Sequence, residues 1–183
     1  MATDESTAAA PVQVRPVLPA DLPALGRIYA HYVEDTAVTF ETEVPGRSAW
    51  EQLTADVREQ GWPFLVATER GAPPGEGVLG YAYVKQWRAR PAYRATVEDS
   101  VYLATEARGR GVGRVLLEAL LAEAARRGAR QVVSVITDAG DDASVRLHER
   151  LGFRWVGRLQ AVGHKHDQWW DTVILQAALP EPG

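Results

Sequence analysis

The chain contains 183 residues with a net charge of −4 and an isoelectric point near 5.6, which argues against a general nucleic-acid or anionic-membrane binder. This length suits one domain with a proper core. The sequence holds no cysteine, which excludes disulfides, thiolate metal sites and a cysteine nucleophile. Its four histidines lack a zinc-binding spacing, so we expect no metal. The apolar runs are too short for a membrane span and the first residues are acidic rather than basic, so we expect a cytoplasmic protein.

Residues 1–11 are small and polar, and we expect a disordered tail ahead of a single domain at residues 12–179. Alternating or β-branched runs predict strands at residues 12–15, 64–69, 78–84, 96–103, 131–136, 154–163 and 169–178. Apolar residues at helical spacing predict helices at residues 21–33, 48–61, 113–128 and 142–150. Asp21 is expected to cap the first helix, and Ser48 with Glu51 to form a capping box for the second. The mixture of hairpins and crossovers predicts a mixed sheet flanked by helices.

The most informative stretch is the loop between the predicted strand at 96–103 and the long helix after it. It holds glycines at alternate positions together with arginines: Gly109, Gly111, Gly113, Arg108, Arg110 and Arg114. Glycines let the backbone approach a ligand and a helix start attracts anions, so the loop predicts a phosphate or pyrophosphate site. Arg114-Val115 replaces the Lys-Ser/Thr of an NTPase loop, and a dinucleotide fingerprint lacks its third glycine, so both nucleotide readings fail. An arginine-rich surface turn is the alternative.

The pattern Arg108-x-x-Gly111-x-Gly113 resembles the R/Q-x-x-G-x-G/A pyrophosphate loop of GNAT-superfamily N-acetyltransferases. Within that superfamily the chain resembles the phosphinothricin and methionine sulfoximine/sulfone acetyltransferases, in the stretches 39–43, 87–93, 96–102, 144–153 and 163–166. The resemblance implies an α/β (α+β) fold with a mixed, mostly antiparallel sheet of about seven strands and helices on both faces. It also implies acetyl transfer from acetyl-CoA to the α-amine of a small amino-acid-like acceptor, and a homodimer.

The same resemblance places the acetyl-CoA. It implies that the pyrophosphate binds the loop made of Arg108, Gly109, Arg110, Gly111, Val112, Gly113 and Arg114. The pantetheine arm is expected along the backbone of Val101, Tyr102 and Leu103, with Ser144 as a further contact. Where the superfamily often carries an asparagine that donates to this arm, the chain has Asp141, and an ionised aspartate cannot donate. Asp141 is assigned to the acetyl-CoA site as well, and the alternatives are that its contact is lost, moved or replaced by water.

Two residues are candidates for the proton transfers that accompany acetyl transfer. Strand alternation places Glu98 on the face opposite Val97 and Val101, in the strand expected beside the thioester. The resemblance implies that Glu98 is the general base, directly or through water, if burial raises its pKa; a surface glutamate is the alternative. His148 stands where many of these enzymes carry a tyrosine that protonates the leaving thiolate. The resemblance implies either this role for His148 or a role as acid/base partner to Glu98. A histidine hydrogen-bonded near a helix C-terminus is the alternative.

Acceptor recognition needs cations, because an amino-acid-like acceptor carries a carboxylate that an arginine fork binds well. The residues assigned to it are Phe40, Arg88, Arg90 and Tyr93, with Lys165 and His166 as further candidates. Solvated loop arginines are the alternative. The basic loop at 88–94 counts against polyamines and aminoglycosides, which with protein N-termini form a second enzyme hypothesis. A non-catalytic acetyl-CoA-binding module is the third hypothesis.

Overall fold

The computed structural model describes residues 12–140 and 142–181. The strands in this range are β1 Val12–Pro16, β2 Phe64–Glu69, β3 Val78–Gln86, β4 Thr96–Leu103, β5 Gln131–Thr137, β6 Arg154–Lys165 and β7 Gln168–Ala178. The α-helices are α1 Leu22–Asp35, α2 Arg47–Glu59, α3 Val112–Arg126 and α4 Ala143–Arg150. Short 3₁₀ turns lie at Pro19–Asp21, Pro91–Tyr93 and Thr105–Ala107. The predicted tail at residues 1–11 and Asp141 lie outside the described residues.

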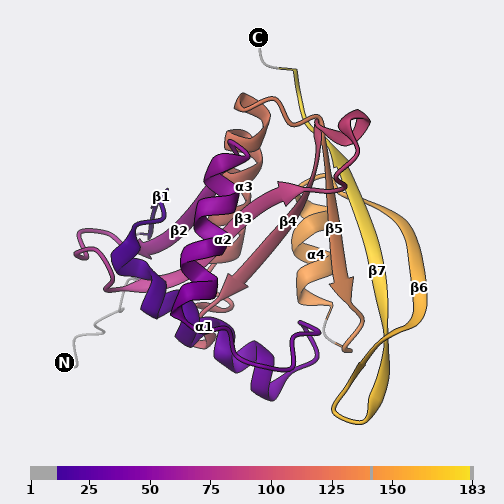
Figure 1. The fold of residues 1–183 in the computed structure, drawn as a ribbon, viewed down its shortest axis with the longest axis horizontal. Helices are drawn as coiled ribbons and strands as arrows, with labels where there is room; N and C mark the ends of the chain where they lie inside the picture. The colour runs from indigo at the N-terminus through magenta and orange to yellow at the C-terminus, as the bar shows by residue number, and fades with distance from the viewer. Residues whose placement is uncertain (1–11, 141, 182–183) are drawn as a thin grey trace, which may run out of the picture.

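The described strands form one open 7-stranded sheet in the order β1-β2-β3-β4-β5-β7-β6 (Figure 1). Neighbouring strands are antiparallel except β4 and β5, which run parallel. The mixed, mostly antiparallel sheet is therefore confirmed, and so are the predicted strands and helices to within a few residues at their ends. Helix α3 connects β4 to β5, because parallel neighbours cannot be joined by a tight turn.

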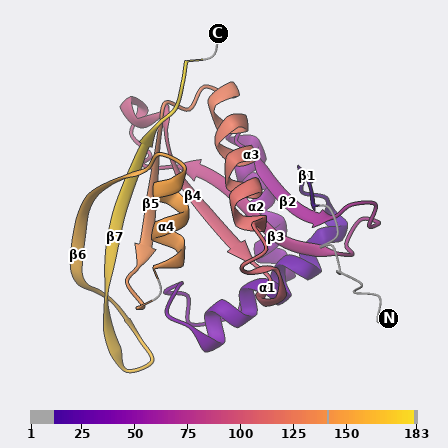
Figure 2. The same cartoon turned by 180° about the vertical axis from the view of Figure 1, so that it is seen from behind.

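Helices cover both faces of the sheet: α1 and α2 lie on one face, and α3 and α4 lie on the other (Figures 1 and 2). Side chains alternate along β4 between these faces. Tyr102 packs edge-on against Tyr29 and Tyr32 of α1, with ring centroids 4.9 and 5.1 Å apart. Leu103 lies beside Gly113 of α3, where an added Cβ would be 3.2 Å from its Cδ1. Even-numbered residues of β4 therefore face α1 and α2, and odd-numbered residues face α3 and α4.

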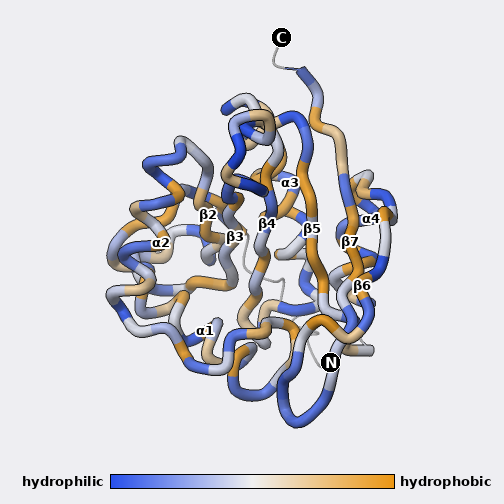
Figure 3. The backbone as a smooth tube through the Cα atoms, turned by 45° about the vertical axis from the view of Figure 1, so that its right-hand side comes forward, coloured by the Kyte–Doolittle hydropathy of each residue, from blue (hydrophilic) through white to orange (hydrophobic). Residues whose placement is uncertain are grey.

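Apolar side chains on both sides of the sheet form the core. Members with no exposed surface include Leu25, Val97, Leu116, Leu120 and Leu175. In Figure 3, hydrophobic segments follow β5 and β7 through the sheet. Burial of such a side chain contributes about 1.5–3 kcal/mol, so the core holds the helices firmly against the strands.

The capping box predicted for the second helix is wrong. Helix α2 begins at Arg47 with Gly46 as its N-cap, so Ser48 and Glu51 lie inside the helix. Glu51 accepts a hydrogen bond from Arg47 Nε at 2.8 Å, one helical turn away, instead of reaching back to a cap. The extended Gly46 (φ −73°, ψ 174°) lets the helix start two residues earlier than the serine signal indicates.

Asp21 precedes α1 as predicted, but its carboxylate makes no hydrogen bond to the helix. It accepts two hydrogen bonds from Arg15 (2.7 and 2.8 Å) and one each from the N–H groups of Leu18 (2.8 Å) and Gly75 (2.9 Å). Burial raises the pKa of Asp21, and these hydrogen bonds outweigh burial, so the pKa lies below its usual value. The predicted cap is therefore wrong: Asp21 joins β1 to the β2–β3 turn.

Candidate active site

The parallel strands β4 and β5 separate after their first residues, and this opens the centre of the sheet. Their register pairs Thr96–Glu98 with Gln131–Val133, yet β4 continues to Leu103 and β5 to Thr137. Figure 1 shows the two strands diverging in the direction of α1. Beyond Glu98, backbone groups of β4 face β5 without pairing with it in this register. Such a strand edge can bind an extended ligand through backbone hydrogen bonds.

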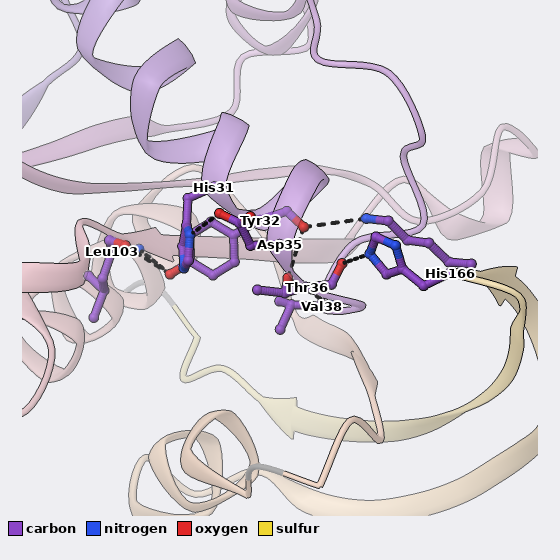
Figure 4. A network of polar contacts seen from close by, with 8 residues as sticks. His31, Tyr32, Asp35, Thr36, Val38, Leu103 and His166 are labelled. Atoms are coloured by element: carbon purple, nitrogen blue, oxygen red, sulfur yellow. Dashed lines mark hydrogen bonds and ion pairs between the residues drawn. The ribbon is translucent and has the colours of Figure 1, made fainter.

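Tyr32 of α1 occupies part of this edge. Its hydroxyl donates to the C=O of Leu103 (2.8 Å) and accepts from the N–H of Leu103 (3.1 Å), as drawn in Figure 4. Backbone groups two residues apart in a strand point to the same edge, so those of Val101 face the opening as well. The C=O of Tyr32 accepts hydrogen bonds from Thr36 Oγ1 (2.8 Å) and Lys165 Nζ (3.3 Å). Tyr32 thus connects β4 to the β6–β7 hairpin.

The loop after β4 forms a cradle that leads into α3. Gly109 and Gly111 adopt left-handed backbone angles, with φ of 72° and 78°, which glycine reaches without steric cost. Gly111 is the N-cap of α3, and no side chain of the described ranges 12–140 and 142–181 caps this helix. The N–H groups of the first turn, starting with Val112, lack partners within the helix. An anion at this point accepts their hydrogen bonds and meets the positive end of the helix dipole.

The arginines of this loop lie in three different settings. The Arg108 guanidinium stacks over the ring of Tyr32, 5.1 Å from its centroid. Arg110 lines a cavity of about 550 Å³ between α1, the β2–β3 turn and residues 104–106. Arg114 donates from Nε to Glu118 at 2.8 Å, one turn along α3. Arg108 therefore lies nearest the open edge of β4, and Arg114 is partly neutralised.

Glu98 lies on the α1/α2 face of β4, as strand alternation predicts. Its side chain is 25% exposed, and Oε1 lies 4.0 Å from Nζ of Lys85, the residue opposite it on β3. Burial raises the pKa of Glu98, and the positive charges of Lys85 and Arg88 only partly oppose this effect. A carboxylate with a raised pKa is better suited to accept a proton near neutral pH.

His148 lies on the other face of the sheet and pairs with Asp99 rather than with Glu98. Its Nε2 lies 2.8 Å from Asp99 Oδ2, and its Nδ1 lies 2.7 Å from the C=O of Ser144. A backbone C=O and an ionised carboxylate are both acceptors, so this arrangement favours the imidazolium form, in which both ring nitrogens donate. Burial lowers the pKa of His148, but the hydrogen bond and charge of Asp99, with the C=O of Ser144, outweigh it and raise the pKa. Ser144, a predicted acetyl-CoA contact, thus also positions His148.

Asp99 was not identified from the sequence. Its side chain is 1% exposed, and its second oxygen, Oδ1, is buried without a hydrogen-bond partner among the residues that the structure describes. The available signal was alternation, which places Asp99 on the apolar face of β4 together with Val97 and Val101. A carboxylate on such a face needs a cation, and a helical histidine elsewhere in the chain was available to supply it.

The predicted acceptor residues fall into two groups, of which the first surrounds the tip of the β6–β7 hairpin. Phe40 packs against Gly163 so closely that a Cβ there would overlap the phenylalanine ring. Lys165 is buried and donates from Nζ to the C=O of Thr39 at 2.8 Å as well as to α1. Burial lowers its pKa. His166 Nε2 lies 3.2 Å from the C=O of the residue after α1 (Figure 4). These residues hold the hairpin against the end of α1.

The second group lies in the loop between β3 and β4. Arg88, Arg90 and Tyr93 are exposed there, and the guanidinium of Arg88 stacks over Trp87, 4.9 Å from the ring centroid. Arg88 is also close enough to Glu98 to affect its pKa. This loop therefore places a positive side chain beside the half-buried carboxylate.

The sequence also matches a known protein family over the residues that form this site. A profile of the acetyltransferase (GNAT) family matches residues 25–153, which include the opening, the glycine-arginine loop and α4. The chain belongs to the GNAT acetyltransferase family. In the described part of this GNAT protein, no helix is both long and apolar enough to cross a bilayer, and no cluster of three or more His, Asp or Glu side chains could hold a metal ion.

The similarity to individual acetyltransferases extends over most of the chain. The chain is 43% identical to a phosphinothricin N-acetyltransferase from Alcaligenes faecalis, over 91% of this chain and 82% of that protein. It is 41% identical to an L-methionine sulfoximine/L-methionine sulfone acetyltransferase from Pseudomonas aeruginosa, over 87% of this chain and 90% of that protein. A crystal structure of a phosphinothricin acetyltransferase from Sinorhizobium meliloti in complex with acetyl-CoA superimposes with a TM-score of 0.85, at 38% identity, over 92% of this chain and 88% of that one.

The residues of this GNAT protein fit acetyl-CoA as co-substrate. The uncapped start of α3 and the left-handed glycines before it suit a diphosphate. The edge of β4 beyond Glu98 suits an extended arm that bears amides. Tyr32 already holds both backbone groups of Leu103, which leaves Val101 as the position where such an arm can add a hydrogen bond without displacing a side chain.

Proposed function

We infer that this GNAT protein transfers the acetyl group of acetyl-CoA to the α-amine of a small amino-acid-like acceptor, of the phosphinothricin, methionine sulfoximine or methionine sulfone type. One observation carries the inference. Glu98, a half-buried carboxylate with a raised pKa, lies in the strand whose open edge leads into an anion-binding loop. The names of the similar proteins support this class of acceptor.

We assign the following roles to the side chains around the opening. Acetyl-CoA, when bound, supplies the acetyl group as an activated thioester. The N–H groups at the start of α3 and the guanidinium of Arg108 hold the diphosphate. The backbone of Val101 aligns the arm. Glu98 removes a proton from the acceptor ammonium, directly or through a water molecule, because an ammonium has no lone pair with which to attack.

For His148 we propose a role that depends on Asp99. The carboxylate keeps the imidazole protonated, and the imidazolium is the proton source for the departing thiolate. Its two N–H groups are held by Asp99 and by the C=O of Ser144, so proton release requires one of these hydrogen bonds to break. Glu98 and His148 lie on opposite faces of the sheet. Glu98 therefore takes a proton from the acceptor on one face, and His148 delivers a proton to the thiolate from the other.

For acceptor binding we propose that Arg88 and Arg90 hold the anionic groups of the acceptor, with Tyr93 and Phe40 on either side of it. Arg88 supports this role because it acts electrostatically on Glu98. Lys165 already donates to two backbone carbonyl groups, so we propose that it and His166 shape the site by holding the hairpin.

A thiol-release assay tests the proposed function. The protein is incubated with acetyl-CoA and, separately, with phosphinothricin, methionine sulfone, spermidine and a short peptide with a free N-terminus. We expect thiol release with the two amino acids, and an N-acetylated product by mass spectrometry. Thiol release with only spermidine or only the peptide would show that the acceptor is a polyamine or a protein N-terminus instead. Binding of acetyl-CoA without turnover of any of these compounds would favour a non-catalytic module.

We further propose a cytoplasmic homodimer with one GNAT domain at residues 12–179, which acts on small molecules rather than on nucleic acids or membranes. The edge strand β6 and the start of β7 expose several large apolar side chains at 47–63%: Trp155, Val156, Leu159, Val162 and Trp169. A second copy that covers this surface accounts for them. Light scattering is expected to give about twice the chain mass of 20.0 kDa, and to fall to one chain in Leu159→Asp. A wild-type monomer would contradict the dimer.

A further inference from the structure

Lys85 stands directly opposite Glu98 in the β3–β4 register, so both side chains project from the α1/α2 face. Nζ of Lys85 lies 4.0 Å from Oε1 of Glu98, and the lysine side chain remains 46% exposed. At that separation the ammonium is close enough to act on the carboxylate but makes no short hydrogen bond that would occupy it. The pair therefore presents one negative and one positive group, side by side, to whatever occupies this face.

The neighbouring positions show where this face is open. The next pair along the two strands, Tyr83 and Ser100, is only partly buried. The pair after that includes Tyr81, which is fully buried, so the face closes in this direction. In the other direction lies the loop with Arg88, whose charge also acts on Glu98. Lys85 and Glu98 therefore lie at the open end of this row of residue pairs on β3 and β4, next to the exposed arginines.

We propose that Lys85 is an acceptor-recognition residue, which binds the α-carboxylate of the acceptor together with Arg88 while Glu98 binds its α-ammonium. This inference rests on the proposed function and deepens it. An α-amino acid carries its two charges on groups attached to one carbon atom, and the Lys85–Glu98 pair offers the opposite charges at a matching short separation. The acceptor thereby meets a partner for each charge without a change in the backbone.

This arrangement discriminates between classes of amine. An amine that lacks the carboxylate offers the Lys85 ammonium no negative group to bind, so it loses one charged interaction. A polyamine places a second positive charge near Lys85 and Arg88, where it is repelled. The charged pair therefore selects α-amino acids over simple amines of the same length.

Lys85 also influences the base. The charged groups that act on Glu98 are Lys85 on β3, Asp99 on its own strand and Arg88 in the loop. Burial and Asp99 raise the pKa of Glu98, whereas Lys85 and Arg88 lower it. Removal of the Lys85 charge is therefore expected to raise the pKa further and to move the acidic limb of the activity profile to higher pH.

The experiment compares two acceptors in three variants. The acceptors are methionine sulfone and 3-(methylsulfonyl)propylamine, which is the same molecule without its carboxylate. The variants are Lys85→Met, Lys85→Arg and Arg70→Met, the last of which removes an exposed positive charge at the far end of β2. We expect Lys85→Met to lower kcat/KM for methionine sulfone about tenfold, the low end for a charged hydrogen bond because the site is partly exposed. For the amine we expect little change.

Lys85→Arg is expected to keep most of the activity, and Arg70→Met all of it, with acetyl-CoA affinity equal to wild type in every variant. An equal loss of kcat/KM for both acceptors in Lys85→Met, or no loss for either, would overturn the role of Lys85. The proposed function would still stand. A Lys85→Arg protein as weak as Lys85→Met would exclude a role for the charge. If wild type acetylates neither of these compounds nor phosphinothricin although it binds acetyl-CoA, the proposed function fails and this inference fails with it.

Discussion

The buried pair of Asp99 and His148 can be tested by replacing its members singly and together. His148→Phe keeps a ring of similar size but removes both N–H donors, and Asp99→Val removes the carboxylate. The two side chains are 1% and 3% exposed and their charged atoms lie 2.8 Å apart. Either single change therefore strands a charged or polar group away from water, whereas the double change leaves two apolar groups in contact.

The expected magnitudes follow from this geometry. Removal of one partner of a buried ion pair destabilises a protein by about 3–5 kcal/mol, because the remaining charge stays buried and unpaired. Replacement of both partners by packed apolar groups is often close to neutral. The double variant should therefore be more stable than His148→Phe, and the coupling between the two positions should be about 2 kcal/mol or more.

The pH dependence has a definite sign. The pKa of His148 is higher in the folded protein than in the unfolded chain, where it is about 6.5. A group of this kind stabilises the fold fully below its unfolded pKa, and the contribution is lost as pH rises through the folded pKa. Wild type should thus lose stability relative to the Asp99→Val/His148→Phe double variant as the pH rises from about 6 to about 9.

Urea unfolding, followed by the fluorescence of the chain's six tryptophans, measures all four proteins at both pH values. A cost of less than about 1 kcal/mol for His148→Phe, or simple additivity of the two substitutions, would contradict a buried ion pair at these positions. So would a difference in stability between wild type and the double variant that stays constant or widens as the pH rises.

The other predictions concern the base, the anion site and the hairpin. Glu98→Gln should lower kcat about 10²- to 10⁴-fold with acetyl-CoA Kd unchanged by calorimetry; equal turnover would remove Glu98 from the mechanism. Arg108→Ala should weaken acetyl-CoA binding about tenfold or more, and Arg114→Ala less, because Arg114 is paired within its own helix; the reverse order would contradict the assigned roles. Gly163→Ala should destabilise the protein by about 1–3 kcal/mol in thermal unfolding, because the new methyl group overlaps Phe40; an unchanged Tm would show that the hairpin tip yields freely.

Much of the fold could be predicted from the sequence because it depends on local patterns. Alternation and β-branched runs locate the strands, and the four-residue spacing of Leu116 and Leu120 locates α3. The glycine-arginine loop could be interpreted because Gly109 and Gly111 need backbone angles that other residues avoid. Alternation along β4 also placed Glu98 on the correct face.

The rest depends on contacts between distant segments. Asp99 and His148 are 49 positions apart, and Tyr32 and Leu103 are 71 apart, so no local pattern joins them. The failed cap at Asp21 has the same cause, because a carboxylate that can cap a helix can equally bind an arginine and a distant turn. Local signals identify the residue type that a position needs, but they do not identify which partner a polar group takes.

The central claim is that the acceptor binds on the Glu98 face of β4 while acetyl-CoA lies at the open strand edge. A crystal structure with coenzyme A and methionine sulfone tests it most directly. We predict the diphosphate at the start of α3, the α-amine within hydrogen-bond reach of Glu98 and the carboxylate toward Lys85 and Arg88. An acceptor bound on the opposite face, beside Asp99 and His148, would contradict the account.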